Sequence, residues 1–378
     1  MKNNRTLFLI FPAVLAVMTL LPSCGGTPGT PAASGDTLSL RYATGLTIEN
    51  HDGYTVVTVS DPWNAGQTLH TYALVPRDAD VPAGLPPATV VRVPLERAVI
   101  STSVHCALVM EMGRGERIAG VCDLQYINLP WIQERSKDGR IADCGNSMSP
   151  TIEKIIELEP DAVFLSPFQN SGGYGRVDAL GIPVIEMADY MESGPLARAE
   201  WMKFYGLLFG AEARADSMFS DVERQYGELK TAAAASSKGR TLMMDKMTGS
   251  VWYVPGGGST IGRLIADANA GYAWSADDRS GSLEMSFETV LDRCEDADVW
   301  LVRYYGPSPL TAESLSAENK GYERFKAFRN REIYGCNTAV SMFYEETPFH
   351  PERLLRDIII ITHPEMENMG MTSYFRHI

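Results

Sequence analysis

The sequence has little positive charge for its length. Its 378 residues include 33 lysines and arginines against 47 aspartates and glutamates, which gives a net charge of −14. Proteins that bind nucleic acids present a basic surface, so we expect no nucleic acid among the partners of this chain. Beyond residue 21, the longest candidate for a membrane span runs only from Ile358 to Thr362. That is far too short to cross a bilayer.

Motifs of common enzyme classes are also missing. Neither the Gly-x-Ser-x-Gly pattern of serine hydrolases nor the His-Glu-x-x-His pattern of zinc peptidases occurs, and the six histidines are scattered. We therefore expect a protein that is not an enzyme, with no catalytic residues, no intrinsic cofactor and no bound metal.

The N-terminus has the features of an export signal. Lys2 and Arg5 precede an apolar run from Leu7 to Leu21, which is too short and wrongly flanked for a stable membrane span. Residues 21–25, Leu-Pro-Ser-Cys-Gly, resemble the bacterial lipoprotein signal. The resemblance implies removal of a signal peptide at 1–23, lipid on Cys24, and a mature chain held at a membrane in the periplasm or cell envelope. An ordinary signal peptide or a short anchor is the alternative.

Cysteine is scarce and shows no metal-binding spacing. With Cys24 assigned to the lipid, five cysteines remain, and an odd number cannot all form disulfides. At least one thiol is therefore free, and we favour buried, inert thiols. The five are Cys106, Cys122, Cys144, Cys294 and Cys336.

The rest of the chain divides into segments that differ in composition and in their pattern of apolar residues. Residues 24–36 are rich in Gly, Pro, Ser and Thr and predict a flexible linker. Residues 37–91 alternate apolar and polar side chains between turn residues, which predicts a β-rich appendage built on a β-hairpin. From residue 97 short apolar strands alternate with helices, which predicts parallel βαβ units. The expected strands are 97–101, 118–122, 162–165 and 181–186, and the expected helices are 104–112 and one opened by Ser149 and Pro150.

A helical stretch separates two such regions. Residues 196–209 and 212–235 predict two helices, the second about 35 Å long. Strands and helices resume at 241–244, 260–270, 287–294, 299–302, 333–334 and 351–362. The fold class is therefore α/β, with an N-terminal lobe at 92–192, a helical interlobe linker at 193–236 and a C-terminal lobe at 237–378. Both lobes are expected to be Rossmann-like, with parallel sheets.

A quasi-repeat supports two similar lobes. Residues 151–163 and 286–299 share a capped helix with a glutamate in its first turn, an acidic stop and a following strand. A single inserted residue separates the two patterns.

These features together resemble the substrate-binding proteins of ABC importers for ferric siderophores, haem and cobalamin. The resemblance covers about residues 92–365 and implies two lobes around a cleft and one rigid interlobe helix. We also expect a monomer. The resemblance also implies docking of Glu153 and Glu288 on a permease dimer that carries a cytoplasmic ATPase. The motifs are 97–103 (RAVISTS), 117–123 (RIAGVCD), 149–165, 255–265 (PGGGSTIGRLI), 350–357 (HPERLLRD) and 363–365 (HPE).

Ligands of open α/β sheets bind beyond the carboxyl ends of the strands. Aromatic side chains there would match a macrocycle or a catecholate ring, and Lys246 and Arg303 would neutralise charge on the chelate. The expected ligand-binding residues are Thr102, Ser103, Tyr126, Phe168, Gln169, Tyr174, Lys246, Trp252, Tyr253, Arg303, Tyr304, Tyr305, Phe343 and Tyr344.

The expected ligand is an iron complex, either a ferric siderophore or haem. A corrinoid such as cobalamin is the alternative within the same family. A bare zinc or manganese receptor is the third interpretation, because His105, Glu345, Glu346 and His350 are metal-ligating residue types.

Overall fold

The computed structural model describes residues 36–169, 173–366 and 369–378. The N-terminal signal and Cys24 lie outside these residues. In the described part of the chain, no helix is both long and apolar enough to cross a membrane.

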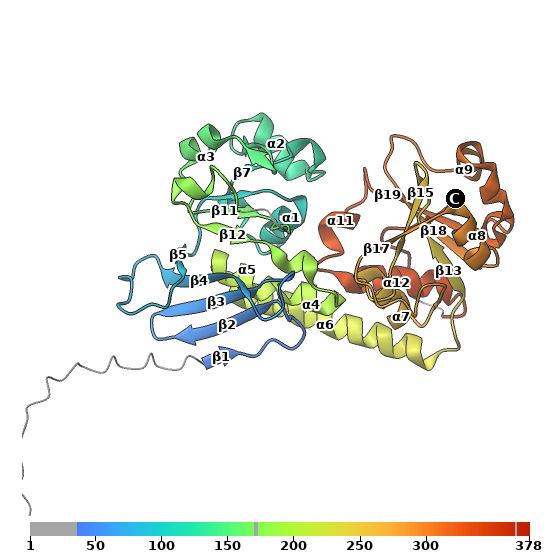
Figure 1. The fold of residues 1–378 in the computed structure, drawn as a ribbon, viewed down its shortest axis with the longest axis horizontal. Helices are drawn as coiled ribbons and strands as arrows, with labels where there is room; N and C mark the ends of the chain where they lie inside the picture. Colours follow the sequence, from blue (N-terminus) through green and yellow to red (C-terminus); the bar gives the residue numbers. More distant parts are fainter. Residues whose placement is uncertain (1–35, 170–172, 367–368) are drawn as a thin grey trace, which may run out of the picture. The chain divides into compact units, whose positions relative to one another are not determined.

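Five strands near the N-terminus form the first sheet, in the order β1-β2-β3-β4-β5 (Figure 1). The predicted hairpin is β2–β3, whose turn contains Gly53 at φ 81°. Neighbouring strands are antiparallel except β4 and β5, which run parallel. The strands are β1 (Asp36–Leu38), β2 (Leu46–His51), β3 (Tyr54–Ser60), β4 (Thr68–Pro76) and β5 (Thr89–Val93).

The first sheet is not a loose appendage, because its inner face shares one hydrophobic core with the elements that follow. Ile48 and Val57 are fully buried in the same cluster as Trp201 and Phe204. The hydroxyl of Tyr72 on β4 donates to the carbonyl of Val184 at 3.0 Å and accepts from the N–H of Glu186 at 2.8 Å. The sheet is therefore an integral layer of the protein.

The first lobe is a parallel sheet in the order β12-β11-β6-β7-β8 with helices around it. The prediction that Ser149 and Pro150 open a helix is wrong. They pair with β9 in a small hairpin, and α3 begins after Thr151. The elements are β6 (Ala98–Ile100), α1 (Ser103–Glu111), β7 (Ile118–Val121), α2 (Pro130–Lys137), β8 (Ala142–Asp143), β9 (Gly145–Asn146), β10 (Ser149–Pro150), α3 (Ile152–Leu158), β11 (Ala162–Leu165) and β12 (Val184–Glu186).

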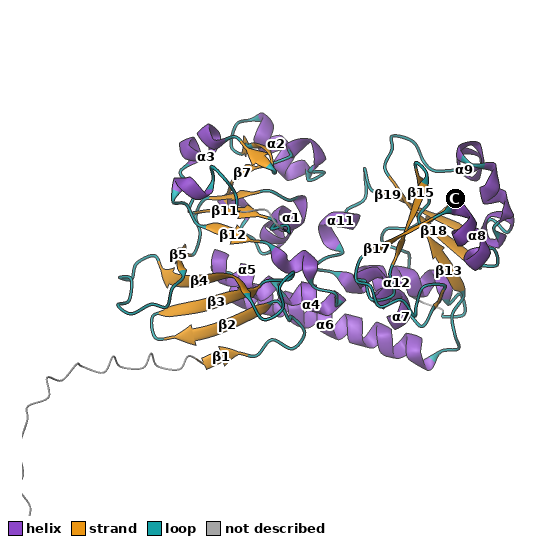
Figure 2. Ribbon diagram, viewed as in Figure 1, coloured by secondary structure: helices purple, strands orange, loops and turns teal. Residues whose placement is uncertain are grey.

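Three helices form the linker between the lobes (Figure 2). The helix expected over 196–209 is interrupted at Trp201, which gives α4 (Pro195–Glu200) and α5 (Met202–Phe209). Gly210, at φ 60°, ends α5 in the left-handed conformation that glycine adopts at low cost. The long helix α6 (Glu212–Ala235) follows, with its apolar side buried.

The second lobe repeats this plan with the order β16-β13-β18-β19-β20, in which only β20 is antiparallel to its neighbour. Strands β14, β15 and β17 form a smaller sheet beside it. The elements are β13 (Thr241–Met244), β14 (Met247–Thr248), β15 (Val251–Pro255), α7 (Thr260–Asp267), β16 (Gly271–Tyr272), β17 (Ser282–Met285), α8 (Phe287–Cys294), β18 (Val299–Tyr304), α9 (Ala312–Glu318), α10 (Lys326–Arg329), β19 (Ile333–Asn337), α11 (Phe343–Glu346), α12 (Pro351–Thr362) and β20 (Arg376–His377).

The sequence repeat corresponds to equivalent places in the two sheets. Helix α3 leads into β11, which lies between β6 and β12. Helix α8 leads into β18, which lies between β13 and β19. The chain is thus an α/β protein with two similar lobes, as the sequence predicted.

The five cysteines are all unpaired and buried. Burial raises the pKa of the Cys122 and Cys294 thiols to about 12, so these thiols stay protonated and unreactive. The expectation that these five thiols are buried is confirmed.

Candidate functional site

The first lobe has a cavity of about 400 Å³ at the carboxyl ends of β6 and β11. These strands are adjacent and parallel, so the residues after them meet at one edge of the sheet. The cavity brings together three of the predicted residues, Thr102, Phe168 and Tyr174. Its lining also includes Ser101, Ser147, Met148, Ser149, Pro150, Ser166 and Arg176.

Hydrogen bonds fix two of these side chains. The Thr102 hydroxyl caps α1 by accepting from the N–H of His105, and lies 2.6 Å from Nδ1 of the same histidine. The Tyr174 hydroxyl donates to Glu186. Burial raises the pKa of Glu186 to about 7. Phe168, by contrast, is 42 % exposed, so its ring is available to a ligand.

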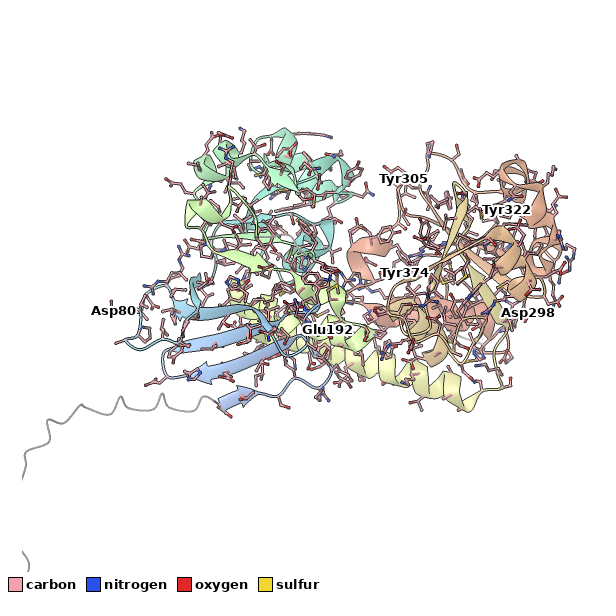
Figure 3. The ribbon with its side chains drawn as sticks, in the orientation of Figure 1. Asp80, Glu192, Asp298, Tyr305, Tyr322 and Tyr374 are labelled. Carbon is pink, nitrogen blue, oxygen red and sulfur yellow. The ribbon has the colours of Figure 1, made fainter. Side chains whose placement is uncertain are left out.

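The second lobe has a cavity of about 410 Å³ at the carboxyl ends of β13 and β18. It brings together six of the predicted residues and adds several that the sequence analysis did not select. The predicted ones are Lys246, Tyr253, Arg303, Tyr304, Tyr305 and Tyr344, and the others include Asp245, Thr248 and Glu318. Figure 3 labels Tyr305, in the loop after β18, whose side chain is 73 % exposed.

The two basic residues of the second cavity are already paired. The Nε atom of Arg303 donates to Oδ1 of Asp245 at 2.9 Å, and a second nitrogen of the guanidinium donates to Oδ2. The Lys246 ammonium donates to Glu318. Each of the two cations therefore has a carboxylate partner within its own lobe. Their expected role in neutralising charge on the chelate remains a prediction.

Trp252 and Phe343 are corrections to the predicted site. Trp252 is fully buried, and its indole N–H donates to the carbonyl of Met244 at 2.9 Å. Phe343 is 2 % exposed and packs against Tyr374. Both rings belong to the hydrophobic core of the second lobe, where a ligand does not reach them.

Three further predicted residues are absent from the linings of both cavities, which are defined by the described residues alone. Tyr126 lies on the surface in the short turn after β7. Ser103 begins α1, and Gln169 is exposed in the loop after β11. The cavities therefore gather nine of the predicted side chains, and these three remain predictions without a structural counterpart.

The sequence analysis missed residues in two places. Ser147, Met148 and Ser149 reach the first cavity because a hairpin forms where a helix was expected. Asp245 directly follows β13, so the rule used to select Lys246 applies equally to Asp245. Glu318, at the end of α9, has no comparable sequence signal.

The histidines considered for a bare metal ion lie in separate networks. The Nε2 atom of His105 is 2.9 Å from Asp189, and His105 is buried. His350 lies between Glu111 and Glu352. Within residues 36–169, 173–366 and 369–378, no three or more His, Cys, Asp or Glu side chains form a group that could hold a metal ion.

The two glutamates of the quasi-repeat occupy matching positions. Glu153 is the second residue of α3 and Glu288 is the second residue of α8. Both are exposed. Glu153 pairs with Arg176 at 3.2 Å, and its pKa is lowered by its own backbone N–H and by that arginine.

Comparison with known proteins agrees with this fold. A relative 28 % identical over 301 residues, an uncharacterized lipoprotein of Methanocaldococcus jannaschii, aligns with 76 % of this chain and 69 % of its own length. The siderophore binding protein BauB, solved with two acinetobactin molecules and ferric iron, superposes with a TM-score of 0.57 at 16 % identity, over 81 % of this chain and 98 % of that chain. A periplasmic heme binding protein from Pseudomonas aeruginosa gives a TM-score of 0.56 at 15 % identity, over 74 % and 97 %.

A family model decides the assignment. The model described as periplasmic binding protein matches residues 108–339, more than half of the chain. The chain belongs to the periplasmic binding protein family.

Proposed function

We propose that this protein is a lipid-anchored receptor that binds an iron chelate, either a ferric siderophore or haem, and delivers it to the permease of an ABC importer. The observation that supports this most is a pair of cavities at the carboxyl ends of equivalent strands, each lined by exposed aromatic side chains. Binding, not catalysis, is the proposed role. The similar proteins described above, a lipoprotein and two binding proteins for iron-containing ligands, agree with it.

The exposed rings are suited to a large chelate. Phe168 on the first lobe and Tyr253, Tyr305 and Tyr344 on the second each present an aromatic face to solvent. Such faces stack on apolar or conjugated ligand surfaces, while the tyrosine hydroxyls hydrogen-bond to ligand oxygens. One ligand held by both lobes would cover these rings.

The test is to purify the protein from its own organism and record a visible spectrum with native mass spectrometry. A Soret band identifies haem, and a broad charge-transfer band with bound iron identifies a ferric siderophore. A corrinoid spectrum would instead identify the bound ligand as a corrinoid, the alternative within the same family. Zinc or manganese bound without an organic ligand would contradict the proposal.

Docking is proposed through Glu153 and Glu288. Each is an exposed carboxylate in the first turn of a helix, and the two helices are equivalent in the two lobes. Two matched acidic residues would suit a partner with two equivalent basic pockets, as a permease dimer would offer.

Anchoring is proposed through lipid on Cys24. Cys24→Ser removes the acceptor sulfur, so we expect the variant to leave the membrane fraction after a high-salt wash. Glu49→Gln, a change at a half-buried position of β2, is the control and should stay membrane-bound. If Cys24→Ser also stays in the membrane fraction, lipid is not the anchor.

A further inference from the structure

Every basic side chain that lines either cavity, among the described residues, has a carboxylate partner. In the first cavity Arg176 pairs with Glu153 at 3.2 Å. In the second, Arg303 pairs with Asp245 and Lys246 pairs with Glu318. The lining of the second cavity is thus neutral overall, since its two cations face two anions.

The Arg303 pair is difficult to redirect toward a ligand. Its side chain is 23 % exposed and that of Asp245 is 15 % exposed, and two hydrogen bonds join them. Burial alone would lower the pKa of Arg303, but the bonds to Asp245 raise it above its usual range. Moving Arg303 to an anionic ligand would leave Asp245 partly buried and unpaired, which is unfavourable.

The remaining ligand-facing groups are uncharged. Phe168, Tyr253, Tyr305 and Tyr344 offer rings and hydroxyl groups, and Thr102 and Ser149 add hydroxyl groups in the first cavity. The net charge of −14 on the whole chain also repels a polyanion. The two cavities therefore supply contact area and hydrogen bonds without surplus positive charge.

We propose that the chelate bound by this protein carries no net negative charge, as in a ferric trihydroxamate, and that polyanionic chelates such as ferric tris-catecholates are excluded. Of the two ligands of the proposed function, this selects a siderophore, because the two propionate groups of haem give it a net negative charge. This inference rests on the proposed function. Three hydroxamates balance the charge of Fe³⁺, whereas three catecholates leave the complex with three negative charges. A trianion needs unpaired cations in its site, and the cavities offer none among the described residues.

The experiment compares two chelates of the same metal on the purified protein by fluorescence titration. We expect a neutral ferric trihydroxamate to bind at least tenfold more tightly than a ferric tris-catecholate. If the tris-catecholate binds equally well or better, the inference is wrong and the proposed function stands. If haem binds and the trihydroxamate does not, the inference is wrong and the proposed function stands. If neither chelate binds, and haem and a corrinoid also fail, the proposed function and the inference are both wrong.

A charge variant tests whether the pairing of Lys246 with Glu318 is what weakens binding of the tris-catecholate. Glu318→Gln, at a partly exposed position at the end of α9, frees Lys246 and should tighten binding of the tris-catecholate by about fivefold relative to binding of the trihydroxamate. Asp292→Asn on α8 removes the same charge away from both cavities and should change neither affinity. No effect of Glu318→Gln, or an equal effect of both variants, would overturn the inference.

Discussion

At the residue scale, His350 holds a positive charge between carboxylates from two parts of the fold. Its Nε2 lies 2.8 Å from Glu111, the last residue of α1, and its Nδ1 lies 3.1 Å from Glu352 in the first turn of α12. Burial alone would lower the pKa of His350, but these two carboxylates raise it to about 9. The imidazolium therefore ties α1 of the first lobe to α12 of the second.

Replacing His350 should cost stability in a pH-dependent way. Because the pKa in the folded state lies above the unfolded value of about 6.5, the stabilisation is complete below pH 6.5 and disappears as the pH rises through 9. We expect His350→Gln to lower the free energy of unfolding by about 2 kcal/mol at pH 6. Urea unfolding from pH 6 to pH 9.5 should show this deficit shrinking. A deficit that does not vary with pH would contradict the charge assignment.

Neighbouring aromatic residues show what the sequence could not decide. Trp252 and Tyr253 follow one another on β15, yet the first is buried and the second exposed, because successive side chains of a strand point to opposite faces. Phe343 and Tyr344 also differ, the first buried and the second exposed, but on the helix α11, where successive side chains point in different directions around the helix axis. Selecting residues beyond the carboxyl ends of the strands identified the loops that line the two cavities. The direction of each side chain depends on partners such as Trp300 and Phe325, which are distant in sequence.

At the scale of elements, the first sheet is joined to the helical linker by two glutamates. Glu200 at the end of α4 accepts the backbone N–H groups of Arg41, Tyr42 and Ala43 at 2.8–3.0 Å. Glu192, which is labelled in Figure 3, accepts those of Thr44 and Gly45, each at 2.8 Å. The segment leading into β2 is therefore held by Glu200 of α4 and by Glu192, which lies shortly before α4.

Glu200→Ala should loosen this junction. The variant leaves three backbone N–H groups without their partner, and we expect a loss of about 3 kcal/mol in the free energy of unfolding at pH 7. Burial alone would raise the pKa of Glu200, but the backbone bonds lower it below its usual range. Its stabilisation is therefore present above the unfolded pKa of about 4.3 and is lost as the pH falls below it.

Urea unfolding at pH 7 and at lower pH measures both effects. Glu157→Ala, an exposed change on α3, is the matched control and should alter stability by less than about 0.5 kcal/mol. Equal stability of Glu200→Ala and Glu157→Ala would show that the protein's stability does not depend on this junction between the first sheet and the helical linker.

Elements with a strong helical period were predicted well. The expected helices at 212–235, 287–294 and 351–362 match α6, α8 and α12, because each buries a continuous apolar side. The parallel pairing of β4 with β5 was not predicted, since alternation indicates strands but not their order. Ser149 and Pro150 also fit a helix start, and only their pairing with β9 reveals a hairpin.

At the scale of the whole molecule, the docking proposal separates delivery from binding. The double variant Glu153→Ala, Glu288→Ala should bind the chelate with unchanged affinity but lower uptake through the cognate permease by about tenfold, because steering charges act on association with the partner. Glu157→Ala with Asp292→Ala, on the same two helices, is the matched control and should leave uptake unchanged. If the docking variant transports like the parent protein, the two glutamates serve only their helices.

The central claim is that both lobes contribute to one ligand site. The direct measurement is a titration of the purified protein with the chelate identified from its own organism, comparing the parent with Phe168→Ala in the first cavity and Tyr305→Ala in the second. We predict one chelate per chain and an affinity about tenfold weaker in each variant. Two chelates per chain, or full affinity after either substitution, would contradict a site shared by the two lobes.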